Sequence, residues 1–321
     1  MILFTADWHI KLGQKNVPVA WALNRYDMFF AQITELEKTC DLHIIGGDLF
    51  DRVPTLEEEE LYYKFIRGVT IPTIIYDGNH EATKKNHTFF DTLRAATEAM
   101  NPLVTVITSS QVLEHNGFKY GIIAYCDLHK KKITESFSSE LPIFTHVRGE
   151  IPPHVKPEVD LDIFAKFPIV FAGDLHSHSN SQQNIVYPGS PMTTSFHRSQ
   201  VKTGYITINE EDWAWEWGEL VLPQLIRATV SDPSEMISTN YDHTIYELEG
   251  DLHDLAGIKD SELLDKKVVK RSTEATLVLS KEMTIQEELV EYLQFILEID
   301  ENRIPDIIGL FNDHAKNAEM E

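Results

Sequence analysis

The chain has 321 residues, of which 42% are hydrophobic and 25% are charged. This composition excludes a disordered or collagenous chain, and the length allows two domains or one large domain with an appendage. With 51 acidic and 28 basic residues the net charge is −23, so the chain is not expected to bind polyanionic nucleic acid without a partner.

The negative charge is concentrated in the last third. Residues 210–321 hold 27 of the acidic residues and 9 of the basic ones, which indicates a separate module. Cys40 and Cys126 are too few for a disulfide framework, no secretory signal is recognisable, and no apolar run reaches the ~20 residues of a membrane span. We therefore expect a soluble, cytoplasmic protein.

Short β-rich runs alternate with helical patterns, which predicts an α/β fold with a layered sheet. The expected strands, each ending at a polar cluster, are Met1–Ala6, Asp41–Ile45, Thr73–Tyr76, Thr105–Ile107, Tyr120–Ala124, Leu141–Thr145, Ile169–Ala172 and Tyr205–Ile208. Helical spacing predicts helices at Tyr26–Lys38 and Leu56–Arg67. Thr55 followed by Glu58 is a capping-box pattern, so the acidic run Glu57–Glu60 is interpreted as the first turn of the second helix.

Three tryptophans, Trp213, Trp215 and Trp217, occupy alternate positions. This spacing predicts one strand with all three rings on the same face. Such a face packs on a neighbouring element or stacks nucleic-acid bases, and the structural interpretation is favoured.

The last hundred residues predict a smaller module after a boundary near residues 222–224. We expect strands at Leu225–Val230 and Tyr241–Leu248, and a charged helix or loop at Glu262–Arg271. The segments Ile285–Leu297 and Ile304–Phe311 have the apolar spacing of amphipathic helices. Their spacing does not decide whether these helices pack on their own domain or offer an apolar face to a partner.

Polar side chains follow five of the expected strands, where open α/β sheets place their ligands. In chain order they are Asp7 and His9, Asp48, Asn79 and His80, His146, and Asp174 and His176. One such residue alone is a weak signal, but five strand ends together predict a mixed carboxylate, imidazole and amide cluster. This donor set suits a pair of divalent cations such as manganese, iron or zinc, and the lack of thiolates argues against a structural zinc site.

These motifs resemble the calcineurin-like metallophosphoesterase superfamily, whose signature includes Asp-x-His, Gly-Asp-x-x-Asp and Gly-Asn-His-Asp/Glu. The matching segments are Asp7-Trp8-His9, Gly47-Asp48-Leu49-Phe50-Asp51 and Gly78-Asn79-His80-Glu81. Within it, Gly-Asp-Leu-Phe-Asp and the later Tyr187-Pro188-Gly189-Ser190-Pro191 resemble the nuclease subunits of the SbcCD family, particularly compact phage versions. The superfamily resemblance covers about residues 1–209.

The resemblance implies an architecture. We expect a metallophosphoesterase β-sandwich flanked by helices at residues 1–220. A small α+β capping domain for DNA recognition is expected at residues 221–283, and a helical partner-binding segment at residues 284–321.

The resemblance also implies a role for each site residue. Asp7, His9 and His176 would hold one metal, Asn79, His146 and Asp174 the other, and Asp48 would bridge them. Mn²⁺ is the expected ion, with Mg²⁺, Fe²⁺ or Zn²⁺ as alternatives. His80 resembles the catalytic histidine that protonates the leaving oxygen, or else orients a ligand. Asp51 is expected to orient a ligand or His80, and Arg52 to contact a DNA phosphate.

One position departs from the family pattern. Where the family has Gly-His-x-His, this chain has Gly173-Asp174-Leu175-His176. A carboxylate can replace an imidazole on a divalent ion. An alternative register pairs His176 with His178, but the apolar run that ends at Gly173 favours the first alignment. Four further histidines, His129, His154, His178 and His197, are expected to lie on the surface.

The resemblance implies a two-metal DNA exonuclease or endonuclease subunit acting in recombination, repair or replication. Its partner would be an SbcC-type ATPase with a long coiled coil, in a heterotetramer that contains a homodimer of this chain. A positive groove on the ATPase would offset the charge of −23. The alternatives are a metal-dependent phosphomonoesterase or protein phosphatase with the same metal centre, and a non-catalytic scaffold, which Asp174 alone suggests.

Overall fold

The computed structural model describes residues 1–84, 87–239, 241–269, 283–297, 299–300 and 302–318. The chain forms two compact units, residues 1–248 with 259–266, and residues 249–258 with 267–321. The expected domain boundaries after residues 220 and 283 stay predictions. Within the described ranges, no helix is long and apolar enough to cross a membrane.

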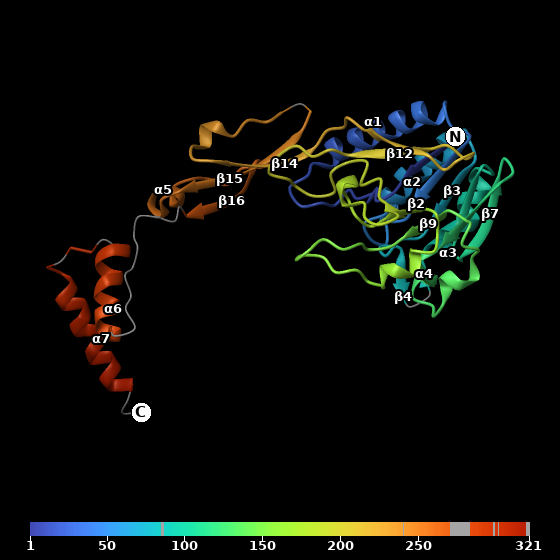
Figure 1. The fold of residues 1–321 in the computed structure, drawn as a ribbon. Coiled ribbons are helices and arrows are strands. Elements are labelled where there is room, and N and C mark those ends of the chain that lie inside the picture. Colours follow the sequence, from blue (N-terminus) through green and yellow to red (C-terminus); the bar gives the residue numbers. More distant parts are fainter. Residues whose placement is uncertain (85–86, 240, 270–282, 298, 301, 319–321) are drawn as a thin grey trace. The chain divides into compact units, whose positions relative to one another are not determined.

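Two β-sheets stack as a sandwich in the first unit (Figure 1). The six-stranded sheet has the order β13-β12-β1-β2-β3-β6. Its strands are β1 (Ile2–Thr5), β2 (Leu42–Gly46), β3 (Thr73–Tyr76), β6 (Val104–Ile107), β12 (Gly204–Ile208) and β13 (Trp215–Glu219). Because β1, β2, β3 and β6 run parallel, their carboxyl ends meet at one edge.

The second sheet has the order β11-β10-β9-β8-β7. Its strands are β7 (Gln111–His115), β8 (Phe118–Ile123), β9 (Ile143–His146), β10 (Val170–Gly173) and β11 (Ile185–Val186). Strands β8 to β11 run parallel, and β9 pairs with β10 so that His146 lies opposite Gly173. All eight expected strands are present, and the predicted α/β sandwich is confirmed.

Smaller elements complete the fold. A three-stranded sheet contains β14 (Leu225–Val230), β15 (His243–Gly250) and β16 (Leu264–Val269), and β4 (Ala82–Lys84) pairs with β5 (His87–Thr88). The α-helices are α1 (Val19–Glu37), α2 (Leu56–Gly68), α3 (Phe90–Met100), α4 (Tyr125–Leu128), α5 (Leu252–Ala256), α6 (Ile285–Glu291) and α7 (Ile304–Ala318). Short 3₁₀ turns lie at η1 (Ile133–Ser136), η2 (Leu161–Phe164), η3 (His178–Asn180) and η4 (Pro233–Glu235), and the π-helical turn η5 (Tyr292–Ile296) follows α6.

The capping box predicted for the second helix is present. Thr55 Oγ1 accepts a hydrogen bond from the Glu58 N–H, and the Glu58 carboxylate accepts one from the Thr55 N–H at 2.9 Å. These bonds satisfy two donors that a helix start leaves unpaired.

Three local expectations are wrong. Helix α1 begins at Val19 rather than Tyr26. Residues 264–269 form β16 instead of a helix or loop, because sheet pairing overrides their charged composition; Arg271 lies outside the described residues. Trp213 precedes β13 in a turn with φ of 61°, so only Trp215 and Trp217 share a strand face.

The alternation of side chains along each strand divides the core. Helix residues such as Phe29 and Tyr62 pack with Leu3 of β1 on the outer face of the first sheet. On the inner face, Phe4 contacts two rings of the second sheet, Phe144 and Phe171, with ring centroids 5.4 and 6.0 Å away. The Phe144 and Phe171 rings themselves stack at 5.2 Å. This aromatic layer holds together the two sheets whose ends carry the polar cluster.

Replacing Phe171 with alanine should lower the free energy of unfolding by about 3–5 kcal/mol, because the fully buried ring leaves a cavity between the sheets. Urea denaturation measures this change. The control is Leu103→Ala, since Leu103 is 40% exposed and its truncation should cost less than about 1 kcal/mol. Equal losses for the two variants would show that the layer does not hold the sheets together.

Candidate metal centre

Unusual backbone geometry marks the ends of the site strands. Asp7, His9, Asp48 and Asp174 have φ values of 58°, 46°, 48° and 102°, a region in which a Cβ is crowded. Such strain costs about 1–3 kcal/mol for each residue and persists only where surrounding contacts impose it. Here the Asp7 N–H donates to the Gly47 carbonyl at 3.1 Å, and the His9 N–H to the Asp48 carbonyl at 2.9 Å. The fold therefore directs these four side chains toward one another.

A buried carboxylate, Glu81, ties two of the loops together. Its oxygens accept hydrogen bonds from the N–H groups of Asp48, Gly78 and Phe50 at 2.8–2.9 Å. Burial and the nearby Asp48 charge raise the pKa of Glu81 to about 8, while these donors oppose the rise. No role was predicted for Glu81 from the sequence. Its position directly after His80 in the Gly-Asn-His-Glu motif was the feature that could have indicated one.

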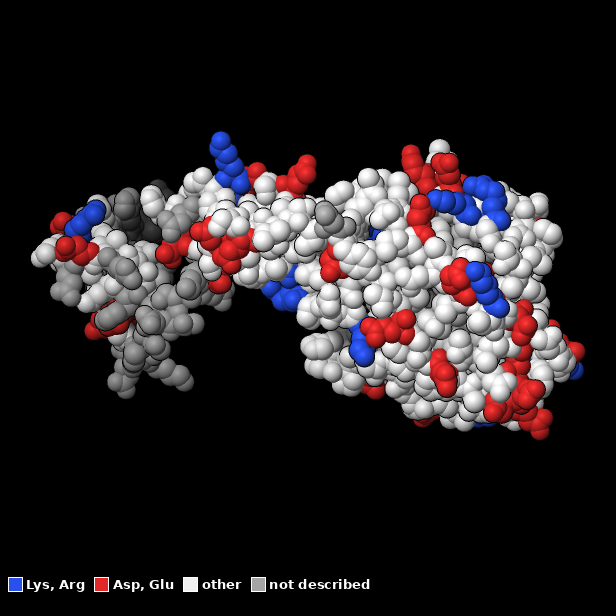
Figure 2. Space-filling model, turned by 90° about the horizontal axis from the view of Figure 1, so that it is seen from above, with Lys and Arg blue, Asp and Glu red and all other residues white. Residues whose placement is uncertain are grey.

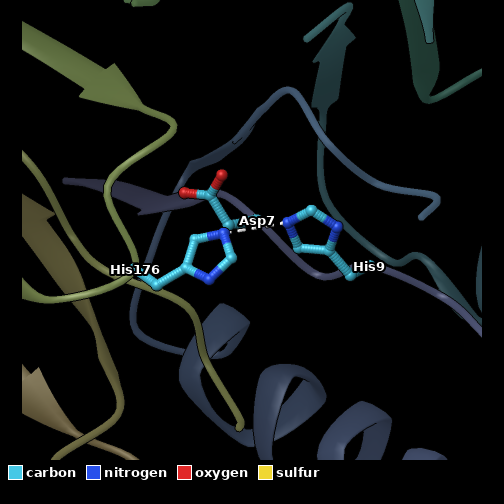
Figure 3. A group of neighbouring side chains, drawn as sticks. All are labelled: Asp7, His9 and His176. Atoms are coloured by element: carbon cyan, nitrogen blue, oxygen red, sulfur yellow. Dashed lines mark hydrogen bonds between the residues drawn. The ribbon is translucent and has the colours of Figure 1, made fainter. Parts of the chain in front are cut away.

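The first donor set is Asp7, His9 and His176 (Figure 3), whose ligand atoms lie within 4.8 Å of one another. The Nε2 atoms of His9 and His176 are 3.0 Å apart. Burial lowers the pKa of His9 to about 3, so its ring is neutral and offers a lone pair. Burial also raises the pKa of Asp7 well above its usual range. An ionised Asp7 therefore requires a positive charge close by.

The second donor set is Asn79, His146 and Asp174. His146 Nδ1 donates to the Gly46 carbonyl at 2.9 Å, so the neutral ring has its lone pair on Nε2. That Nε2 lies 2.9 Å from Asn79 Oδ1 and 3.9 Å from Asp174 Oδ1. Burial would lower the pKa of His146, but Asp48 and its neighbouring carboxylates raise it well above the usual value, so without a cation Nε2 holds a proton that a bound metal would displace.

The Asn79 amide lies among the same groups. With its oxygen and nitrogen exchanged, its NH₂ group is 3.1 Å from Asp48 Oδ2, 3.2 Å from Asp174 Oδ1 and 2.9 Å from His146 Nε2. With Oδ1 in that place instead, oxygen and nitrogen lone pairs converge, which suits a divalent cation. The residues therefore fit the implied metals.

Asp48 lies between the two donor sets and is 2% exposed. Its Oδ2 is 3.4 Å from Nε2 of His146, 3.7 Å from Nε2 of His9 and 3.8 Å from Nε2 of His80. Burial opposes ionisation of Asp48, but these imidazoles outweigh it and lower the pKa. This position is the one that a bridging ligand requires.

His80 adjoins both sets without belonging to either. Its Nδ1 donates to the carbonyl oxygen of Asp51 at 2.5 Å, and its N–H donates to Asp48 Oδ1 at 2.9 Å. The Asp51 carboxylate pairs with Lys11 at 2.8 Å and lies 3.7 Å from His9 Nδ1. Asp51 thus contacts His80 through its backbone and His9 through its side chain. Their catalytic roles stay predictions.

Arg52 and Arg148 differ in their relation to the donor sets. Arg52 pairs with Glu58 at 3.1 Å and is 43% exposed, so its DNA contact stays a prediction. Arg148 was not predicted. Its Nε and Nη2 each lie 3.3 Å from one oxygen of Asp174, and its side chain is 41% exposed. Arg148 follows His146 by two positions, and in an extended segment this spacing directs both side chains to the same side. This spacing was the sequence feature that could have identified Arg148.

The surface position expected for two of the remaining histidines is wrong. His178 and His197 are only partly exposed and line a cavity next to His176, whereas His129 and His154 are exposed. The ring of His178 packs against the ring of Trp217, with the two ring centroids 5.5 Å apart.

Three comparisons relate this chain to known proteins. Residues 1–165 match the family model described as Calcineurin-like phosphoesterase. The "Probable exonuclease subunit 1" of Escherichia phage T5 is 38% identical over 327 residues, which cover 98% of this chain and 99% of that protein. The crystal structure of TT1561 of Thermus thermophilus has 12% identity and a TM-score of 0.44, with 68% of this chain and 98% of that chain covered. The predicted family is confirmed, and the chain belongs to the calcineurin-like phosphoesterases.

Proposed function

We propose that this protein is a two-metal-dependent nuclease subunit that hydrolyses phosphodiester bonds of DNA in recombination, repair or replication. The observation that carries the proposal is the buried Asp48 carboxylate, with three imidazole Nε2 atoms within 3.8 Å of Oδ2 and a donor set on either side. The phage T5 relative, which is named as an exonuclease subunit, supports a nuclease over other phosphoesterases.

The proposal keeps the predicted ligand roles. Asp7, His9 and His176 would hold one ion, Asn79, His146 and Asp174 the other, and Asp48 would contact both. Two divalent ions, when bound, supply Lewis-acid polarisation of the phosphate and a lowered pKa for an attacking water. The mixed nitrogen and oxygen donors suit Mn²⁺, with Mg²⁺, Fe²⁺ or Zn²⁺ as alternatives.

His80 is the proposed general acid. The bond to the Asp51 carbonyl keeps a proton on Nδ1, so Nε2 is the atom that gains and loses a proton. This Nε2 is 3.8 Å from Asp48 Oδ2, and the ring is 35% exposed. His80 would therefore hold a proton beside the reacting phosphate and transfer it to the leaving oxygen.

Arg148 supplies a positive charge at the second donor set. Asp174 raises the pKa of Arg148, so the guanidinium stays charged beside the carboxylate. Two of its five N–H donors face Asp174, and the partly exposed remainder is free to bind a phosphate oxygen in a forked geometry. We expect Arg148 to contact the scissile phosphate and Arg52 a more distant DNA phosphate.

The charge of the chain favours a DNA-binding partner. The face in Figure 2 shows acidic side chains beside most basic ones, without a broad basic area among the residues described there. The partner that the proposal requires is an SbcC-type ATPase with a coiled coil, whose positive groove would hold the DNA backbone. A homodimer of this chain would form the centre of a heterotetramer with that ATPase.

Helices α6 and α7 are the proposed docking site for this partner. They pack together in the second unit, where the Gln286 amide of α6 donates to Oδ1 of Asn312 of α7. Large apolar side chains on them remain exposed, including Ile285 at 72% and Leu310 at 63%. Exposed apolar residues of this size on one helical pair suit a helix-in-groove contact with a coiled coil.

The manganese-loaded chain with its ATPase should hydrolyse DNA, and His80→Gln should lower kcat by about 10²–10⁴-fold because the proton donor is lost. DNA cleavage assays and elemental analysis test this, since the variant should keep its metal content. His154→Gln, at an exposed histidine, is the matched control. Efficient hydrolysis of p-nitrophenyl phosphate without cleavage of any DNA form would favour the phosphomonoesterase instead.

Arg148→Ala should raise the constant for inhibition of DNA hydrolysis by inorganic phosphate by roughly 10- to 100-fold. Arg148→Lys should recover part of this loss, because lysine keeps the positive charge but lacks the forked N–H donors of a guanidinium. Arg52→Ala should weaken DNA binding while leaving phosphate inhibition unchanged. Manganese content must be measured for each variant. Lost manganese with unchanged phosphate affinity of the loaded fraction would mean that Arg148 only supports Asp174.

Ile285→Asp combined with Leu310→Asp should weaken ATPase binding on the order of a hundredfold, because two apolar anchors are lost at about 1.5 kcal/mol or more each. Pull-down of the SbcC-type ATPase measures the effect, and hydrolysis of bis(p-nitrophenyl) phosphate should not change. Val53→Asp, at an apolar residue that is 60% exposed in the first unit, is the control. Retained ATPase binding by the double variant would contradict the docking site.

A further inference from the structure

A cavity of about 600 Å³ adjoins the metal centre on the side of His176. This volume is within the range of about 300–1,000 Å³ that is typical of small-molecule sites. Its walls come from the η3 turn, the loop at residues 190–197, the loop at residues 201–203 and Trp217 of β13. All of these segments belong to the first unit.

The cavity is continuous with the first donor set. His176, a member of that set, lines the cavity, and so does Thr194. The Thr194 hydroxyl is 3.0 Å from Nδ1 of His176, so one wall of the cavity also orients a predicted metal ligand. A molecule with a phosphate at the metal centre would therefore have its adjoining group at the mouth of this cavity.

Two aromatic rings form a fixed part of the wall. His178 and Trp217 stack with centroids 5.5 Å apart and an interplanar angle of 20°. Trp217 Nε1 donates to the Pro188 carbonyl at 2.9 Å, and His178 Nδ1 donates to the Tyr187 carbonyl at 2.7 Å. These bonds hold both rings in place and leave Nε2 of His178 as an acceptor. Preorganised aromatic rings of this kind favour stacking with a nucleobase.

The other lining groups are mixed. Ile151, Met192 and Val201 are apolar, Asn180 contributes an amide, and the hydroxyls of Ser177 and Ser179 bond to each other at 2.8 Å. Lys202 also lines the cavity; its side chain is 77% exposed, and its ammonium lies 3.8 Å from a carboxylate oxygen of Glu219. Apolar and aromatic side chains with a few hydrogen-bonding groups match the base and sugar of a nucleoside.

We propose that this cavity binds the deoxynucleoside next to the scissile phosphate. The inference rests on the proposed nuclease function and adds a subsite to it. The base would pack against the His178 and Trp217 pair, with the amide of Asn180 and Nε2 of His178 as hydrogen-bonding partners. A subsite of this size holds one terminal nucleoside, which favours release of mononucleotides from a DNA end.

Calorimetric titration of the manganese-loaded, full-length protein tests this subsite. The probes are inorganic phosphate, deoxyribose 5-phosphate, and the 5′- and 3′-monophosphates of deoxyadenosine. At least one nucleotide should bind roughly tenfold or more tightly than the two ligands that lack a base. The preferred isomer identifies which side of the scissile bond occupies the cavity. Equal affinities for nucleotide and inorganic phosphate would overturn the proposal.

Val201→Trp fills the cavity, and Val201→Ala is its matched control. The backbone of Val201 is held by Gln224 through bonds of 2.8 and 2.9 Å, so the side chain can change without loss of these bonds. Val201→Trp should remove the nucleotide preference and leave the affinity for inorganic phosphate unchanged, whereas Val201→Ala should keep both. Ser179→Trp fills the cavity from the η3 turn and replaces Val201→Trp if that variant does not fold.

A parallel DNA cleavage assay separates this inference from the proposed function. Suppose that the wild-type protein prefers nucleotides, that Val201→Trp abolishes this preference, and that the protein cleaves no DNA. This result would support the subsite and contradict the nuclease function. DNA cleavage by wild type with no nucleotide preference would overturn the subsite and leave the nuclease function standing. When both hold, Val201→Trp should lower kcat/KM for DNA by about tenfold or more and leave the affinity for inorganic phosphate within about twofold of wild type.

Discussion

The burial of the Asp48 carboxylate is the constraint on which the site depends. A carboxylate that is 2% exposed loses its hydration and must be compensated by donors and positive charge. Backbone N–H groups and imidazoles supply part of this compensation, and the converging lone pairs of Asn79 and His146 direct the rest to a cation. The positive φ values at four site residues accompany this burial, because the backbone must turn sharply after each strand to bring the site side chains together around the Asp48 carboxylate.

Each of the two sheets contributes some of the side chains of this centre. The first sheet delivers Asp7, Asp48 and Asn79 from the ends of β1, β2 and β3, and the second delivers His146 and Asp174 from the ends of β9 and β10. Their separation is set by aromatic rings between the sheets rather than by the polar residues themselves. Close packing in such a layer transmits strain, so a change of ring size between the sheets would also alter the geometry of the metal ligands.

Charge is balanced locally at the site and left unbalanced over the chain. Arg148 accompanies Asp174 at the position where the family has a neutral histidine, so the extra negative charge at the second donor set meets a guanidinium 3.3 Å away. The overall charge of −23 is not balanced in this way. A nuclease subunit of the proposed kind would rely on another subunit to bind the DNA backbone, and its own residues would determine where the phosphate and the adjoining nucleoside lie.

The positions of the eight strands, the α/β class and the polar cluster were predictable because each rests on a local pattern, an apolar run with Asp, His or Asn directly after it. Features that depend on contacts between distant segments were not. The charged residues 264–269 became a strand only beside β15, Glu81 gained its role from three backbone donors in two loops, and Arg148 from Asp174, 26 residues further on. Sequence alone thus determined which residues have the chemistry, and the tertiary structure decided which of them meet, because a side chain's partners are set by packing across the fold and not by its neighbours in the chain.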